Sequence, residues 1–217
     1  KATMANITFP LDIPDVIILE TAINEQGDYI ITVESTWQST HCRQCGREIS
    51  QFHGYDKWLT IRHLSILGRR VYTKLQPKRY RCPYCDEGPT TTQQLDWYNA
   101  RSGQTIAYEK HLLLQLVNST VSDVSRKEAI GYDAVVGVLN RYIDAAVDWD
   151  SLEELGIIGV DEIALHKGRN SYVAVITSQH PNGQVCLLGI LPDRKKETVR
   201  AFFDSIPARL RPTIHSV

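Results

Sequence analysis

The chain has 217 residues, of which 42% are hydrophobic, so it can bury one large core or two to three small ones. No apolar run approaches the roughly 18 residues that a membrane-spanning helix needs, and the N-terminus lacks the pattern of a signal peptide. These features exclude a membrane protein, and we expect a cytoplasmic protein with reduced thiols.

The net charge of −1 hides an uneven distribution along the chain. Residues 1–40 carry one Lys and six acids, whereas residues 41–103 carry eleven Lys and Arg against five acids, a net charge of +6. Residues 104–147 and 148–217 each have a net charge of −1. A single basic segment in an acidic or neutral chain favours a nucleic-acid partner for that segment.

The first 40 residues predict a small N-terminal β element. A turn signal, Gln26-Gly27-Asp28, precedes the β-rich run 30–34, which reads Ile-Ile-Thr-Val-Glu. We interpret this region as a packing element without chemistry of its own.

Two C-x2-C pairs define the next segment, 41–103. The pairs are Cys42 with Cys45 and Cys82 with Cys85. A two-residue spacer lets both sulfurs of a pair face one ion, so four thiolates predict a structural Zn²⁺ site. Disulfides are disfavoured in a cytosolic chain, and a thioredoxin-like redox pair would need one C-x-x-C near a βαβ pattern. The lone Cys186 lies in an apolar run and is interpreted as a small buried hydrophobe.

The insert between the two cysteine pairs has strand character over 58–61 and 70–75 and can form a β-hairpin that returns the chain to the metal. Basic residues are interleaved here with Tyr72 and Tyr80, which on strands predicts cations beside aromatic rings, as phosphate contacts require. A solvated charged hairpin is the alternative. The candidate DNA contacts of this zinc-binding basic module are Arg69, Arg70, Lys74, Lys78, Arg79 and Arg81.

Residues 104–147 predict a helix-turn-helix domain. Apolar periodicity favours helices over 104–118, 121–129 and 134–147, with Asp133 as the N-cap of the third. In this layout the last helix enters the major groove, although a small bundle without DNA contacts has the same pattern. The candidate DNA contacts are Ser125, Arg126, Lys127, Tyr132, Asn140 and Arg141.

The last part of the chain begins with an acidic stretch, 148–156, that ends in glycine and predicts a linker. The elements expected beyond it are a hairpin of strands 157–160 and 172–176 around a polar turn at 167–170, a strand over 184–191, a helix over 195–205 and a new strand from 213. Three antiparallel strands, a crossing helix and a new strand have the order of an RNase H-like fold. The chain is therefore expected to be α+β and multidomain.

Asp161 stands where the first of these apolar runs ends. A carboxylate at that place is costly to bury without a compensating charge, so it is either a capped structural acid or a metal ligand. The spacing of residues leaves both interpretations open.

Taken in order, several motifs give the chain a family likeness. They are Leu11-Asp12-Ile13-Pro14, the two cysteine pairs, Lys78-Arg79-Tyr80-Arg81-Cys82, the three helices and Gly159-Val160-Asp161-Glu162. This ordered set resembles the bacterial insertion-sequence transposases of the ISL-three family over nearly the whole chain.

The resemblance implies a DDE transposase. Its zinc-binding module and helix-turn-helix would bind double-stranded DNA at terminal inverted repeats, and an RNase H-like domain, here 157–217, would cut DNA and join the 3′ ends. A homodimer on DNA and association with the bacterial nucleoid are further expectations.

The resemblance also implies that Asp161 is the first acid of a catalytic triad that holds two Mg²⁺ or Mn²⁺ ions. Glu162 cannot replace a missing acid, because successive residues of a strand face opposite sides. The second acid is expected beyond Val217 and the third later still, so this chain by itself is expected to bind DNA without cleaving it. The alternative function is a zinc-containing, sequence-specific DNA-binding regulator without catalytic activity.

Overall fold

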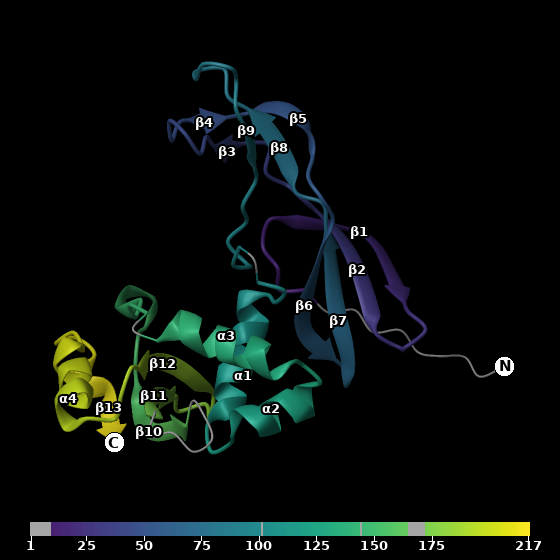
Figure 1. Cartoon of the computed structure of the whole chain (residues 1–217). Helices are drawn as coiled ribbons and strands as arrows, with labels where there is room; N and C mark the ends of the chain where they lie inside the picture. Colours follow the sequence, from purple (N-terminus) through teal and green to yellow (C-terminus); the bar gives the residue numbers. More distant parts are fainter. Residues whose placement is uncertain (1–9, 101, 144, 165–171) are drawn as a thin grey trace. The chain divides into compact units, whose positions relative to one another are not determined.

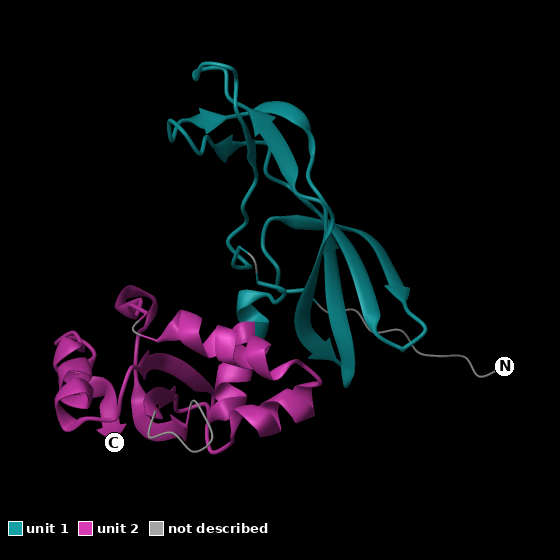
Figure 2. Cartoon of the chain, viewed as in Figure 1, with its two compact units in different colours: residues 1–108 teal, residues 109–217 magenta. Residues whose placement is uncertain are grey.

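The computed structural model describes residues 10–100, 102–143, 145–164 and 172–217, which form a mixed α/β structure (Figure 1). The chain divides into two compact units, residues 1–108 and 109–217, and the division falls inside the first helix, α1 (Ile106–Leu116) (Figure 2). None of the helices in the described ranges has the length and apolarity to cross a bilayer.

The first unit contains a four-stranded sheet in the order β1-β2-β7-β6. Its strands are β1 (Val16–Ile23), β2 (Tyr29–Ser35), β6 (Leu59–Ile66) and β7 (Arg69–Leu75). The expected hairpin of the insert is present as β6 and β7, but β2 pairs in parallel with β7. The N-terminal element and the insert therefore share one sheet, and its apolar face packs on Leu95 and Trp97.

The cysteines lie in two smaller sheets of the same unit. One sheet pairs β3 (Thr40–His41) with β4 (Glu48–Ile49), and the other has the order β5-β8-β9, from β5 (Gln51–Tyr55), β8 (Lys78–Arg81) and β9 (Thr90–Thr92). Their small core consists of Ile49, Tyr80 and the cysteines. Each cysteine pair thus sits in the turn between two strands.

Three helices follow, as the sequence predicts: α1, α2 (Val121–Glu128) and α3 (Tyr132–Tyr142). The α2 helix is capped by Thr120, whose hydroxyl accepts a hydrogen bond from the Asp123 N–H at 3.1 Å. The prediction that Asp133 caps α3 is wrong, because α3 begins at Tyr132, two residues earlier than predicted, and its N-cap is Gly131. The helix also ends at Tyr142 rather than 147, since Ile143 is extended.

The second sheet has the order β12-β11-β10-β13. Its elements are β10 (Gly156–Ala164), β11 (Tyr172–Gln179), β12 (Val185–Leu191), α4 (Lys196–Ser205) and β13 (Ile214–Ser216). The first three strands are antiparallel, and β13 lies parallel to β10 after the crossing helix α4. Apolar residues of the sheet pack on Phe202 of α4. The expected turn at 167–170 lies outside the described residues.

Two expectations for this region are wrong. The stretch 148–156 is not a free linker, because Trp149, Leu152 and Leu155 pack on the core and the Arg209 guanidinium donates to the Leu152 carbonyl at 2.8 Å. Gly156 already belongs to β10. Its backbone requires glycine, because its φ is +66° and an added Cβ would lie only 2.2 Å from the Gln179 carbonyl oxygen. The strand then continues past Asp161, which lies within β10 and not at its end.

Candidate metal and nucleic-acid sites

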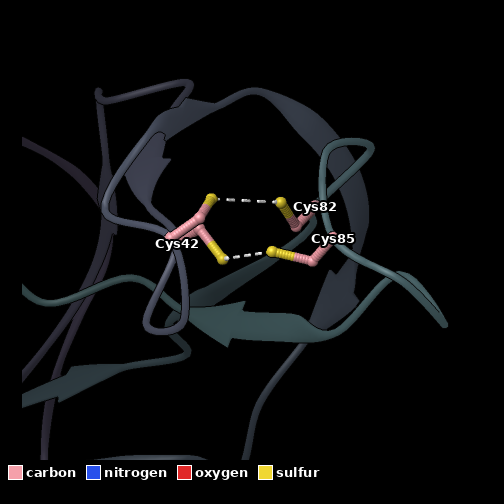
Figure 3. A group of neighbouring side chains, drawn as sticks. Cys42, Cys82 and Cys85 are labelled. Atoms are coloured by element: carbon pink, nitrogen blue, oxygen red, sulfur yellow. Dashed lines mark hydrogen bonds between the residues drawn. The ribbon is translucent and has the colours of Figure 1, made fainter.

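The four predicted cysteines converge. Cys42 and Cys45 lie in the β3–β4 turn, which the Gly46 N–H closes on the Cys42 carbonyl at 2.8 Å, and Cys82 and Cys85 follow β8. Figure 3 shows Cys42, Cys82 and Cys85 turned toward one another. The sulfurs of Cys42 and Cys85 are 4.0 Å apart, those of Cys45 and Cys82 are 3.7 Å apart, and all four lie within 4.8 Å of one another.

This geometry fits a tetrahedral zinc ion. Zn–S bonds of about 2.3 Å in a tetrahedron separate the sulfurs by about 3.8 Å. The thiols differ in acidity: backbone N–H groups of Cys45 and Gln44 lower the pKa of Cys42 to about 6, whereas burial raises the pKa of Cys85 to about 12. A bound cation would favour the thiolate form of all four. The four cysteines are therefore placed so that they could hold a structural zinc ion.

The candidate basic residues of the first unit lie on two sheets, on β7 and on β8. On β7, Arg70 pairs with Asp28 at 2.7 Å, and the Lys74 ammonium lies 5.7 Å from the centre of the Trp58 ring. The Arg69 guanidinium donates to the Gly27 carbonyl at 3.1 Å and remains exposed. A cation of this strand does lie beside an aromatic ring, but that ring is Trp58 and not the predicted Tyr72 or Tyr80.

On β8, the candidate residues differ in exposure. Lys78 is only 5% exposed, because its ammonium donates to the Ser35 carbonyl at 2.8 Å and pairs with Glu34 at 3.2 Å. The expectation that Lys78 belongs to an open basic surface is therefore wrong. Arg81 is exposed, and Arg79 is half-buried with a hydrogen bond of 2.6 Å to the Thr90 hydroxyl. A DNA surface on β8 can use these two guanidinium groups.

The candidate contacts in the helix-turn-helix are partly structural. The Ser125 hydroxyl donates to the Ile130 carbonyl at 2.7 Å and closes the turn between α2 and α3. Arg126 pairs with Asp123, yet 77% of its side chain is exposed. Lys127, Tyr132 and Asn140 are also exposed, so these helices keep polar side chains at the surface.

Arg141 has a role that the sequence did not indicate. Its guanidinium bonds Glu109 at 2.5 Å, and the Tyr142 hydroxyl donates to the same carboxylate at 3.1 Å. The Glu109 side chain is fully buried between α1 and α3, and burial together with its negative charge raises the pKa of Tyr142. Arg141 therefore neutralises a charge inside the helical domain.

Asp161 is half-buried on β10, and both of its oxygens accept hydrogen bonds. The backbone N–H of Asn118, in the turn between α1 and α2, donates to Oδ2 at 2.7 Å, and the Glu162 N–H donates to Oδ1 at 2.8 Å. Sequence reasoning missed the Asn118 contact. An Asn two residues beyond an apolar helix is a signal for a left-handed helix end, but not for what its N–H will bind.

The Glu162 carboxylate has different partners from that of Asp161. Its carboxylate pairs with Arg194 at 2.6 Å, and the Arg194 guanidinium stacks on the Tyr172 ring at 4.3 Å. In the parts of the chain that the structure describes, the four cysteines form the only group of three or more potential metal ligands. Asp161 thus offers one carboxylate ligand, and these described residues do not complete a Mg²⁺ site around it.

Three consecutive segments match known family models. Residues 38–85 match the zinc-finger of transposase IS204/IS1001/IS1096/IS1165, residues 93–143 match the helix-turn-helix domain of transposase family ISL3, and residues 158–217 match a transposase model of the same family. The first segment contains the four cysteines, and the last begins within β10.

A curated relative supports the same likeness. The chain is 31% identical over 179 residues to the transposase for insertion sequence element IS1001 from Bordetella parapertussis. The match covers 81% of this chain and 42% of the relative, so the chain spans less than half the length of that protein. No solved structure matches the chain.

Proposed function

Because the chain belongs to transposase family ISL3 along the three matched segments, we propose that it supplies the DNA-binding region and the first part of the catalytic domain of an insertion-sequence transposase. In this proposal the zinc module and the helix-turn-helix bind terminal inverted repeats, as a homodimer on chromosomal DNA in the bacterial cytoplasm. The last domain belongs to the machinery that cuts DNA and transfers the strand.

The main observation in support of the proposal is that Asp161 lies on β10 of the second sheet. The strand order β12-β11-β10-β13, with β13 parallel to β10 after α4, supports an RNase H-like domain. Asp161 lies on β10, the strand from which the first acid of such a site is expected. We propose it as the first catalytic carboxylate.

The roles of the residues follow from their chemistry. In the complete protein, divalent ions would supply activation of the attacking oxygen and stabilisation of the departing one. Asp161 would hold such an ion through a carboxylate that faces away from Glu162. Glu162 instead anchors Arg194, which ties the strand to the loop before α4.

DNA binding is proposed for exposed or half-buried polar side chains of two regions. In the zinc module these are Arg69, Lys74, Arg79 and Arg81, and in the helix-turn-helix they are Arg126 and Lys127 with Tyr132 and Asn140. Phosphate contacts by such cations make affinity strongly dependent on salt, while contacts to base edges from a recognition helix give sequence preference.

A binding assay tests the first half of the proposal. Fluorescence anisotropy with the element's own terminal repeat, against a scrambled duplex of equal length, should show tighter binding to the repeat at each salt concentration. Equal affinity for the two duplexes would contradict recognition of the repeats.

A cleavage assay tests the second half. A polypeptide extended to the length of the IS1001 relative should cut repeat DNA in the presence of Mg²⁺ or Mn²⁺, and Asp161→Asn should abolish cutting while DNA binding persists. Cutting that survives Asp161→Asn would contradict the catalytic role of Asp161. Sequence-specific binding with no cutting at all would instead favour a DNA-binding regulator.

A further inference from the structure

Three aromatic side chains, each three residues from the next, are half exposed on the first unit. They are Phe52, Tyr55 and Trp58, with exposed fractions of 52%, 48% and 52%, and we call them the aromatic strip. The first two lie on β5 and the third directly precedes β6, so all belong to one compact unit (Figure 2). Large rings bury much area when they fold into a core, so a group of exposed ones indicates a binding surface.

The contacts of the strip place it along one face of the four-stranded sheet. Its first two rings meet edge to face, with their centres 5.3 Å apart. The Tyr55 hydroxyl lies 3.5 Å from the Glu34 carboxylate on β2, and the Lys74 ammonium on β7 lies 5.7 Å from the centre of the Trp58 ring. Lys74 is the β7 partner of Thr32, which shares a face of β2 with Glu34 because alternate residues of a strand point to the same side. The rings therefore border the face that carries Lys74.

The charges beside the strip favour an anionic partner. Lys57 is exposed and Lys74 is half-buried, and across the described residues neither ammonium forms an ion pair. The nearby acids are engaged elsewhere: Glu34 pairs with Lys78 at 3.2 Å, and Asp56 accepts hydrogen bonds from a β9 hydroxyl and from the Lys57 N–H. Both ammonium groups are therefore available for phosphates.

This combination of rings and cations fits single-stranded DNA better than a duplex or a protein. The bases of a duplex stack on one another, whereas unpaired bases stack on exposed aromatic side chains that lie beside a positively charged path for the backbone. Protein interfaces are also rich in aromatic residues, but their cores are depleted of lysine. Here one lysine precedes Trp58 in the chain and another lies beside its ring.

We propose that the aromatic strip is a stacking surface for unpaired bases, and that Lys57 and Lys74 contact the phosphates of the same strand. The inference goes beyond the duplex binding proposed above and does not depend on the proposed catalytic site. It gives the first unit a second activity, which is to hold a DNA strand that has separated from its partner.

Base stacking is tested by fluorescence anisotropy of the zinc-loaded chain with a labelled oligothymidylate of about 12 nucleotides, a length within the range that single-strand-binding folds cover. The matched control ligand is an abasic strand of equal length, which keeps the phosphates and lacks the bases. The oligothymidylate should bind at least about fivefold more tightly, because one stacked base contributes at least about that factor. Equal affinity for the two strands would overturn the inference.

Substitutions of Trp58 test whether the ring itself is needed. Trp58→Leu keeps an apolar side chain without a ring and should weaken oligothymidylate binding at least about fivefold, whereas Trp58→Phe keeps a ring and should stay within about twofold. Neither variant should change binding of the abasic strand. Tyr84→Leu is the control, because Tyr84 is 58% exposed and lies outside the strip, and it should leave binding unchanged. Unchanged oligothymidylate affinity in Trp58→Leu would refute the stacking role.

Two parallel measurements separate this inference from the proposed function and from a protein partner. Binding to the terminal-repeat duplex should persist in Trp58→Leu; repeat binding by a chain that does not distinguish oligothymidylate from the abasic strand would leave the transposase proposal standing and refute this one. Sedimentation velocity reports self-association. If Trp58→Leu abolishes a dimer and leaves oligothymidylate binding unchanged, the strip is an interface between copies of the chain and the inference is wrong.

Discussion

At the scale of single residues, His63 shows how burial fixes a protonation state. The ring is 4% exposed, with Nε2 3.1 Å from the Leu11 carbonyl and Nδ1 3.0 Å from the Thr105 hydroxyl. A carbonyl only accepts, so Nε2 carries the proton and Nδ1 accepts from Thr105. That hydroxyl in turn accepts from the Tyr108 N–H at the start of α1, which makes neutral His63 part of the helix cap.

This arrangement predicts a pH dependence of stability. Burial lowers the pKa of His63 below the ordinary value of 6.5, against weaker opposing effects of the Leu11 carbonyl and Asp12. Below about pH 6.5 the unfolded chain takes up a proton that the folded chain resists, so the free energy of unfolding should fall as pH is lowered from about 7 to 5.

The contribution of His63 can be isolated by chemical denaturation at several pH values. His63→Gln should cost about 1–3 kcal/mol at neutral pH through lost hydrogen bonds and should flatten the decrease below pH 6.5. The matched control is His53→Gln, since His53 is exposed on β5. A slope that is unchanged in His63→Gln would show that other groups control acid unfolding.

The zinc ligands give a second prediction at this scale. Cys82→Ser should reduce bound zinc well below one equivalent per chain, because a hydroxyl is a poor replacement for a thiolate and the remaining three sulfurs lose the tetrahedral geometry. Bound metal is measured by atomic emission. Cys186→Ser is the control, because Cys186 lies outside the cluster and should keep one equivalent. Full zinc in Cys82→Ser would mean that the ligands are assigned wrongly.

Site residues can be predicted from the sequence when their local spacing alone fixes their geometry, and not when their role depends on distant parts of the chain. Paired cysteines are recognisable because their spacing alone constrains the sulfurs. The burial of Lys78 is not recognisable in this way. An alternation of charged residues does not show that its ammonium will bond to Ser35 and Glu34 of β2. The Asn118 contact is invisible for the same reason: it uses a backbone N–H and joins residues 43 positions apart.

At the scale of elements, α1 and α3 are joined by a buried ion pair. Arg141→Ala would leave the Glu109 carboxylate buried without that guanidinium, which should lower the free energy of unfolding by on the order of 2 kcal/mol or more. Breaking a fully buried pair costs about 3–5 kcal/mol, and this is an upper value here because the Arg141 side chain is 35% exposed. The measurement is thermal unfolding of α-helical signal by circular dichroism.

A double variant separates support from DNA contact. Adding Glu109→Gln to Arg141→Ala removes the buried charge and should recover part of the lost stability. If DNA affinity recovers with it, Arg141 acts through the fold; if affinity stays low in the restabilised variant, Arg141 also contacts DNA. No recovery of stability would refute the charge argument.

The strand β8 carries the prediction for phosphate binding. Arg79→Ala with Arg81→Ala should weaken binding to repeat and scrambled duplexes alike and reduce the slope of log affinity against log salt by about 1 for each phosphate that the protein no longer neutralises. The matched Arg79→Lys and Arg81→Lys variants keep the charge and should keep the slope. Unchanged affinity of the double Ala variant would remove β8 from the DNA interface.

Elements were predictable where the pattern is local. The helices over 104–147 and the strands of the last domain follow from apolar periodicity, whereas their ends depend on caps that other residues can supply, as Gly131 does in place of Asp133. The acidic stretch 148–156 has the composition of a linker, but Trp149 and Leu152 find an apolar core that only the folded chain provides. Pairing of β2 with β7 joins segments that no local pattern connects.

At the scale of the whole molecule, stability is divided among separate cores. The second unit packs Leu155, Ile158 and Phe202 around α4 without any zinc ligand, and the four-stranded sheet of the first unit has its own core at Val33 and Val71. In the described residues, the core of the two small sheets that carry the cysteines consists of Ile49, Tyr80, Cys42 and Cys82, with Cys85 packed against it. Because this core is so small, we expect these two sheets to depend on a bound metal for their fold.

Zinc removal should therefore unfold one region and spare the rest. Hydrogen exchange measured by mass spectrometry, with a chelator added in steps, should show loss of protection over 38–55 and 78–92, while 156–164 and 172–191 stay protected. The reason is that metal-binding free energy is folding free energy only for the residues that the metal organises. Restoring Zn²⁺ should restore protection, whereas Mg²⁺ should not, since thiolates select softer metals. Simultaneous loss of protection over 156–164 and 172–191 would contradict separate cores. It would mean that the cysteine cluster also stabilises the second sheet, including the strand that carries Asp161.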